Sequence, residues 1–190
     1  NVLRMWVEQK DMKEINKYLH EKYNDVINGK IENKEIIKRS RLRKERFEVK
    51  CPECRKQHHL TECLKIKWCD KCGTETKFFL TTKYKKPTIG SGIAGVLYAW
   101  EKEDKTFDDS YLFMKVQGVN DTYTHPLTKE KRQVDFVSGT VYEDFNDYIP
   151  NYKHYAEEVI NKAKPIYKAM EWDISSIRTG KLQMKLDEWW

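Results

Sequence analysis

All five cysteines of the chain lie within 22 residues, in the stretch CPECRKQHHLTECLKIKWCDKC. Four of them form two Cys-x2-Cys pairs, Cys51 with Cys54 and Cys69 with Cys72, and fourteen residues separate the pairs. Each pair predicts a tight turn that presents two thiolates to one ion, and two such turns complete a tetrahedral site for a structural Zn2+. This spacing is typical of a zinc ribbon.

The same stretch holds three further possible ligands, Cys63, His58 and His59. Four thiolates already close the coordination shell, which favours Cys63 as a small buried residue and the histidines as surface or supporting groups. The alternative is that His58 replaces one cysteine as a ligand. A thioredoxin-like redox pair is disfavoured, because it needs a βαβ context that the sequence lacks and would not explain two pairs.

A closed four-thiolate site argues against catalysis, because a catalytic zinc needs an open position for water and a nearby base. Glu53 and Glu62 are close in sequence, but neither belongs to a recognisable zinc-enzyme motif. The GSGIAG stretch from Gly90 to Gly95 lacks the Lys-Ser/Thr ending of a nucleotide loop, and we interpret it as a turn between strands. The sequence therefore predicts a protein that is not an enzyme.

The predicted fold class is α+β: a zinc-ribbon or knuckle site with a small antiparallel sheet, flanked by N- and C-terminal helices. A hydrophobic content of 39% is enough for a core in 190 residues. We divide the chain into a helical segment (1–46), a zinc-binding β domain (47–148) and a second helical segment (149–190). In the first segment, periodicity predicts one helix from Asp11 to Asn28 and another from about Glu32 to Glu45.

The middle segment contains the runs GVLYAW, YLFMKV and VDFVSGTVYEDF, which are rich in aromatic and β-branched residues. Such runs predict strands of the antiparallel sheet. In the last segment a helix is expected to begin at Pro150, with tyrosines along a packing face. Pro165 interrupts that pattern, so we expect a kink or a break there.

Three strings of the chain, CPECRKQH, WCDKC and SGTVYEDF, resemble the Jiv-type zinc domain, also called the cleavage-inducing molecular chaperone domain, of some DnaJ-like proteins. That family shows C-x2-C-x3-H, then W-C-x2-C-x3-H, then a closing G-x-V-Y-D, and the resemblance covers roughly residues 47–148. The matching residues are Cys51, Cys54, His58, Trp68, Cys69, Cys72, Gly139, Val141 and Tyr142.

The chain departs from the family at Thr76, which stands in place of the second histidine, and at Glu143, which replaces the Asp. The segment between the second cysteine pair and Gly139 is also longer. A J domain acts through an HPD tripeptide, and the nearest string here is His125-Pro126-Leu127, in an expected strand-connecting turn. The resemblance therefore implies a zinc-stapled, chaperone-like interaction module without the co-chaperone activity of a J domain.

Two kinds of partner fit the composition. The first is the set of other protein subunits of a large assembly, with six tryptophans and eleven tyrosines as anchors. The two tryptophans of the terminal KLDEWW either join these anchors or fold back on the protein's own helices. The alternative is RNA or DNA in a ribosome or transcription machine, contacted by KRSRLRKER and by the lysines at 83, 85 and 86. The net charge of +6 permits this alternative without demanding it, because acidic residues interrupt the basic ones.

The clustered, odd number of cysteines fits a reducing compartment better than a secreted disulfide framework. No apolar run approaches the roughly 20 residues that cross a bilayer, so peripheral membrane association is the most that we expect. The sequence begins with Asn1 instead of Met, which indicates either a fragment or a chain from which a presequence was removed. We therefore expect an intracellular protein, with mitochondrial residence as the specific hypothesis.

Overall fold

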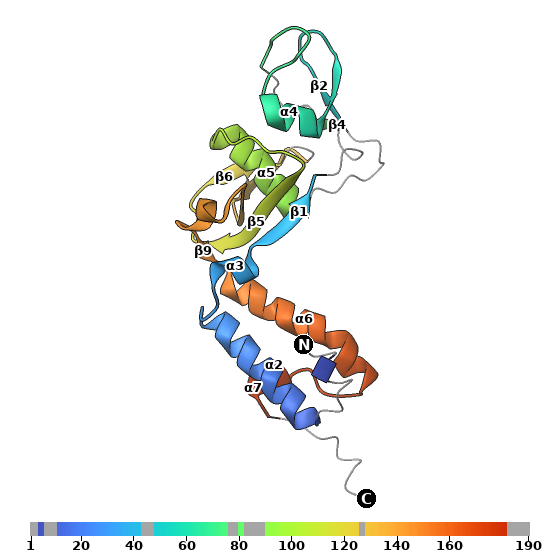
Figure 1. Cartoon of the computed structure of the whole chain (residues 1–190), viewed down its shortest axis with the longest axis vertical. Coiled ribbons are helices and arrows are strands. Elements are labelled where there is room, and N and C mark those ends of the chain that lie inside the picture. Colours follow the sequence, from blue (N-terminus) through green and yellow to red (C-terminus); the bar gives the residue numbers. More distant parts are fainter. Residues whose placement is uncertain are drawn as a thin grey trace, which may run out of the picture. The chain divides into compact units, whose positions relative to one another are not determined.

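The computed structural model of the chain describes residues 4–5, 11–42, 48–75, 80–81, 90–125 and 128–181. The fold is α+β, with antiparallel sheets, N- and C-terminal helices that pack together, and a cluster of four cysteines (Figure 1). The predicted fold class is confirmed. The chain forms two compact units, one that joins residues 1–32 to 151–190 and one that spans residues 33–150.

The terminal unit is built from α2 (Met12–Ile27), α6 (Tyr152–Ala169) and α7 (Ser176–Thr179). The Asp11 carboxylate accepts a hydrogen bond from a backbone N–H of the first turn of α2, which fixes where the helix begins. Gly29, with a φ of +67°, provides the left-handed turn that follows the helix. The buried core of this unit consists of Ile15, Leu19, Ile160, Ala163, Tyr167 and Ile177.

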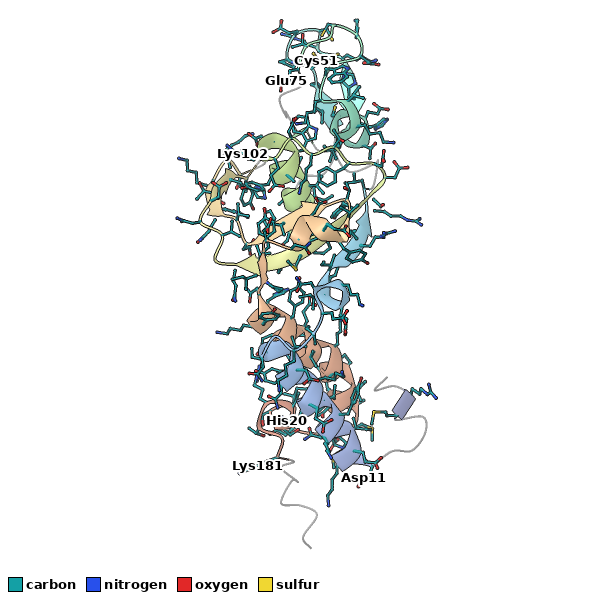
Figure 2. All side chains as sticks on the ribbon, turned by 60° about the vertical axis from the view of Figure 1, so that its left-hand side comes forward. Asp11, His20, Cys51, Glu75, Lys102 and Lys181 are labelled. Carbon is teal, nitrogen blue, oxygen red and sulfur yellow. The ribbon has the colours of Figure 1, made fainter. Side chains whose placement is uncertain are left out.

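Polar side chains inside the terminal unit are hydrogen-bonded to one another. Tyr167 and Ser176 both donate to Asn16 Oδ1, at 2.9 and 2.7 Å, and all three residues are buried. Nearby on α2, His20 places Nδ1 2.8 Å from the Ile177 carbonyl oxygen (Figure 2). Because buried polar groups are costly when unpaired, these contacts favour one arrangement of the three helices.

The helix α6 continues through Pro165 to Ala169, so the break considered there does not occur. Proline removes one backbone hydrogen bond from a helix interior, but the buried residues Tyr155 and Tyr167 lie on either side of it along the chain. Ile160 before the proline and Tyr167 after it belong to the same core, which holds the two parts of the helix in one unit. The prediction that the tyrosines form a packing face is confirmed at these two positions.

The second predicted helix, from about Glu32 to Glu45, is wrong. The helix α3 (Asn33–Ile36) lasts one turn, and strand β1 (Lys38–Arg41) follows it. Strand β1 pairs antiparallel with β5 (Ser110–Gln117), and this pairing overrides the local helical preference of the basic run. The rest of that run, residues 43–46, lies outside the described residues.

The main sheet has the order β1-β5-β8, and β9 (Ile149–Pro150) also pairs with β5. Strand β5 contains the YLFMKV run, and β8 (Phe136–Gly139) contains part of the VDFVSGTVYEDF run. All these pairings are antiparallel, so the predicted small antiparallel sheet is confirmed. The smaller sheets comprise β2 (Glu48–Lys50), β3 (Gln57–His59) and β4 (Leu80–Thr81), and the hairpin of β6 (Thr122–Thr124) and β7 (Lys131–Gln133).

The interpretation of GSGIAG as a turn, and of GVLYAW as a strand, is wrong, because both runs belong to helix α5 (Ser91–Lys102). A Cβ atom at Gly95 would lie 2.4 Å from Ser138 Oγ in β8. A Cβ atom at Gly92 would lie 2.6 Å from the hydroxyl oxygen of Tyr111 in β5. The glycines therefore let the helix lie close against the sheet.

The SGTVYEDF string ends strand β8 at Gly139 and then forms a 3-10 helix, η1 (Tyr142–Phe145). Asp144 Oδ2 accepts hydrogen bonds from the backbone N–H groups of Thr140, at 2.7 Å, and Val141, at 3.2 Å. The string thus begins with the last two residues of the strand and continues as a turn whose backbone N–H groups Asp144 caps. In the described part of the chain, no helix has the length and apolar character needed to cross a membrane.

Candidate metal centre

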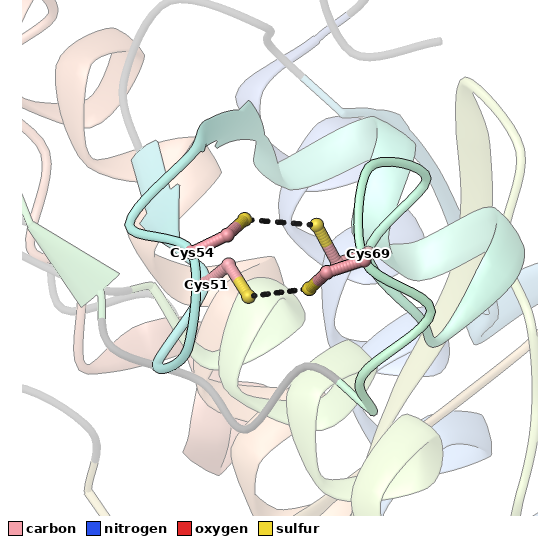
Figure 3. Close-up of side chains that lie close together, drawn as sticks. Cys51, Cys54 and Cys69 are labelled. Atoms are coloured by element: carbon pink, nitrogen blue, oxygen red, sulfur yellow. Dashed lines mark hydrogen bonds between the residues drawn. The ribbon is translucent and has the colours of Figure 1, made fainter.

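The four cysteines of the two pairs lie together in the unit of residues 33–150 (Figure 3). Cys51 Sγ lies 3.6 Å from Cys72 Sγ, and Cys54 Sγ lies 3.6 Å from Cys69 Sγ. All four sulfur atoms lie within 4.8 Å of one another. Tetrahedral zinc with Zn–S bonds of about 2.3 Å requires sulfur atoms about 3.8 Å apart. The cluster is therefore compatible with a metal such as zinc.

The two cysteine turns share one backbone design. In each, the first cysteine accepts a hydrogen bond through its carbonyl oxygen from the N–H four residues later, at 3.1 Å for Cys51 and 2.8 Å for Cys69. Its own N–H donates to the carbonyl five residues later, at 2.9 and 2.8 Å. The residue after the second cysteine is left-handed, with a φ of +56° at Arg55 and +72° at Gly73. Each turn thus brings its two thiols to one side.

Neighbouring groups give the thiols of the cluster different pKa values. Hydrogen bonds with the side chain and backbone of Thr74 lower the pKa of Cys72 to about 6. A backbone hydrogen bond at Lys56 favours the thiolate of Cys54, but desolvation and the three neighbouring thiols outweigh it and raise its pKa to about 11. Because metals bind the thiolate, metal uptake at neutral pH must displace protons from the cluster.

Cys63 lies apart from the cluster, as predicted. It is 2% exposed, and its carbonyl oxygen accepts a hydrogen bond from Trp100 Nε1 at 3.2 Å. It belongs to a hydrophobic core that joins helix α4 (Leu60–Ile66), which lies between the two cysteine turns, to helix α5. The buried residues of this core are Leu42, Val49, Leu60, Cys63, Leu64, Val96, Leu97, Ala99, Trp100, Phe107 and Tyr111.

The two histidines of the stretch have different surroundings. His58 is buried, with Nε2 3.3 Å from Cys69 Sγ, whereas His59 is exposed and precedes α4. Glu62 Oε2 accepts a hydrogen bond from the His59 backbone N–H at 3.1 Å, so this carboxylate caps the start of helix α4. His58 therefore supports the cluster from beside it, and it also forms a second group of possible ligands with Cys69 and Asp70.

Sequence reasoning missed two residues beside the cluster, Lys56 and Asp70. Lys56 Nζ donates to both Asp70 carboxylate oxygens, at 2.8 and 2.7 Å. This ion pair raises the pKa of Lys56 and lowers the pKa of Asp70. Asp70 lies between the two ligands of the second turn and Lys56 follows the first turn by two residues, but neither position alone shows that the two side chains meet.

Several residues predicted to contact a partner lie outside the described part of the chain, namely the lysines at 83, 85 and 86, the arginines at 43 and 46, and the terminal KLDEWW. Thr76, Pro126 and Leu127 also lie outside it, although His125 directly follows β6 as expected for the turn. Among the described residues, many basic side chains pair with acids. Such pairs join Lys56 to Asp70, Lys65 to Asp108, Lys67 to Asp104, Lys115 to Asp135, Arg132 to Glu130, and Arg178 to Glu157.

None of the five cysteines forms a disulfide, which is consistent with a reducing compartment. Comparison with protein-family models, with curated proteins and with solved structures finds no match for this chain. The assignment of a candidate metal centre therefore depends on the donor set and on its geometry.

Proposed function

We propose that this chain is a non-enzymatic accessory or assembly subunit of a larger protein complex. In this proposal a structural zinc ion staples an interaction module of the kind found in the Jiv-type domain of DnaJ-like proteins. The observation that carries the proposal is the group of four cysteine sulfur atoms within 4.8 Å of one another. Four thiolates occupy all four positions of tetrahedral zinc, so they leave none for a reacting water.

The connection of the cluster to the rest of its unit supports a structural role for the metal. Leu60 and Leu64, between the two cysteine turns, share a core with Val96 and Trp100 of helix α5. The Phe107 N–H donates to the Leu64 carbonyl oxygen at 3.1 Å. Metal binding by the four cysteines thus fixes the segment between the two turns, whose leucines form part of the hydrophobic core.

An exposed tryptophan beside the cluster supports the choice of a protein partner. Trp68 is 56% exposed and directly precedes Cys69, so metal binding would hold its backbone in place. Tryptophan is among the residues that most often dominate binding energy in protein interfaces. The nucleic-acid alternative has less support, because the acidic partners of the described basic residues offset their attraction for phosphate.

Isolation of the protein from its native source under gentle conditions tests the proposal. We expect it to migrate with a large assembly that contains no nucleic acid, with a single zinc ion per chain by elemental analysis. Sizing, the ultraviolet absorbance ratio and metal content are the measurements. Migration as a free monomer would contradict the proposal, as would co-migration with RNA or DNA that high salt removes.

Replacing Trp68 by Ala should weaken the assembly without unfolding the chain. We expect association to weaken by about 2 kcal/mol or more, which is roughly 30-fold, because a tryptophan anchor contributes at that level. Zinc content should not change. The measurement is the fraction of tagged protein that co-purifies with the assembly, and Lys71→Ala, on an exposed residue of the adjacent turn, is the control. Equal recovery of the two variants would show that Trp68 does not contribute to the interface.

A further inference from the structure

A chain of contacts beside the candidate metal centre joins Lys56, Asp70, His58 and Cys69. Lys56 holds both carboxylate oxygens of Asp70, and Asp70 Oδ1 lies 3.6 Å from His58 Nδ1. On the other side of the ring, His58 Nε2 lies 3.3 Å from Cys69 Sγ. Lys56 and His58 follow the first cysteine turn, whereas Cys69 and Asp70 belong to the second. The contacts therefore join the two turns independently of the metal.

The chemistry of a metal-bound thiolate fixes the direction of one of these contacts. A thiolate carries no hydrogen, so it can only accept a hydrogen bond. With metal bound, the His58 ring must therefore direct an Nε2–H group at Cys69. Cys69 is 0% exposed, so water does not reach this sulfur to stabilise its charge, and the imidazole N–H is the donor placed to do so.

The surroundings of His58 hold its ring in this orientation. His58 is 5% exposed and lies in strand β3, where it is registered with Val49 of β2. The strand pairing and the burial fix the position of His58, and the ion pair of Asp70 with Lys56 lies near the Nδ1 edge of the ring without a hydrogen bond to it. Groups of this kind, which orient a ligand or stabilise its charge, commonly change metal affinity by about 10- to 100-fold.

We propose that His58 is a positioning residue that keeps the Cys69 thiolate on the metal by directing its Nε2–H group at the sulfur. This inference rests on the proposed zinc site, and it assigns the control of metal retention to a residue that is not a ligand. The expected consequence is slow release of zinc, as a structural role in a long-lived assembly requires.

Two His58 variants test the proposal in the full chain. His58→Phe keeps the volume of the ring and removes the N–H donor, whereas His58→Gln retains a side-chain N–H. We expect zinc transfer to a chromogenic chelator to be roughly 10- to 100-fold faster for His58→Phe. His58→Gln should stay within a few-fold of the wild type. His125→Phe is the matched control, because His125 is also 5% exposed and belongs to the β6–β7 hairpin.

Replacing zinc with cobalt gives a spectrum that reports on the metal ligands. Loss of stability alone would not change this spectrum. The sulfur-to-cobalt charge-transfer band should shift in His58→Phe and stay unchanged in His125→Phe. If His58→Phe fails to fold, His58→Leu decides, because it also removes the N–H donor and has a smaller side chain. We expect His58→Leu to release zinc at least as fast as His58→Phe.

Three results would overturn the positioning role. The first is an unchanged release rate and spectrum in His58→Phe, and the second is an unchanged release rate in His58→Leu. The third is a wild-type cobalt spectrum typical of three thiolates and one imidazole, which would make His58 a ligand. A wild-type protein that binds no zinc would instead overturn the proposed function, so the two failures are distinguishable.

Discussion

Replacing Cys51 or Cys69 by Ser is expected to abolish zinc binding and to unfold the region around the two cysteine turns. A serine hydroxyl is not ionised at neutral pH, so it does not replace a thiolate ligand. Structural zinc contributes about 10–16 kcal/mol of apparent binding free energy in small zinc-dependent folds. Whole domains are stable by only about 5–15 kcal/mol, so loss of the metal removes most of the stability of this region.

Cys63→Ser is the matched control for this prediction, because it makes the same chemical change at a cysteine outside the cluster. Cys63 is buried in the hydrophobic core, so its replacement should cost about 1–3 kcal/mol for the buried hydroxyl and leave zinc content intact. Metal analysis and circular dichroism are the measurements. If Cys63→Ser lost zinc as completely as the two ligand variants, the assignment of the donor set would be wrong.

The cysteine cluster was predictable from sequence because its signal is local. The Cys-x2-Cys spacing fits a single tight turn, and only the pairing of two such turns depends on the rest of the fold. The contact between Lys56 and Asp70 was not predictable in this way. The two residues are fourteen positions apart, and nothing in either turn alone shows that they face each other until the cluster has formed.

Helix α5 shows why part of the fold could not be predicted. A short apolar run such as GVLYAW has the same composition in a buried helix as in a strand, so periodicity does not separate them. Gly92 and Gly95 favoured a turn on local grounds. Their role follows from a contact that is distant in sequence, because α5 packs against both the core near the cysteine cluster and a second core with Val134 and Phe136.

A helix was predicted where strand β1 forms, and the reason for this error is related. The KRSR residues have a good helical preference, but their antiparallel register with β5 aligns Arg39 with Leu112 and Ser40 with Tyr111. Alternate residues of β1 are exposed, which matches the period of a strand. Charged residues on a strand at the edge of the sheet also discourage pairing with other chains. Tertiary pairing therefore outweighed local propensity here.

The close packing of α5 leads to the second prediction, that Gly95→Val destabilises the unit of residues 33–150 by about 3 kcal/mol. In an exposed helix a residue larger than glycine is usually favourable, because glycine costs about 1 kcal/mol relative to alanine. Here the first added carbon would lie 2.4 Å from Ser138 Oγ and 2.9 Å from Phe136 Cδ2. Packing, and not helix propensity, therefore decides whether Gly95→Val raises or lowers the free energy of unfolding.

Moving the neighbouring atoms away from the added carbons would cost free energy. Ser138 Oγ donates to the Gly92 carbonyl oxygen at 3.2 Å and is buried, so rotating it away would leave a buried hydroxyl without that partner. Phe136 belongs to the second core of the helix. The helix must then move off the sheet, and this movement would also disturb the core that it shares with the segment between the cysteine turns.

Urea unfolding of the zinc-loaded protein, followed by circular dichroism, measures this effect. Gly90→Ser is the control, because among the described residues other than its chain neighbours no atom lies within 4 Å of a Cβ placed at Gly90. Serine is also a favourable residue at a helix N-cap, so this variant should be as stable as the wild type or slightly more stable. Equal midpoints for Gly95→Val and Gly90→Ser would show that α5 does not pack closely against β8. A lower midpoint for Gly95→Val alone would show that the glycines of GSGIAG serve the contact between helix and sheet.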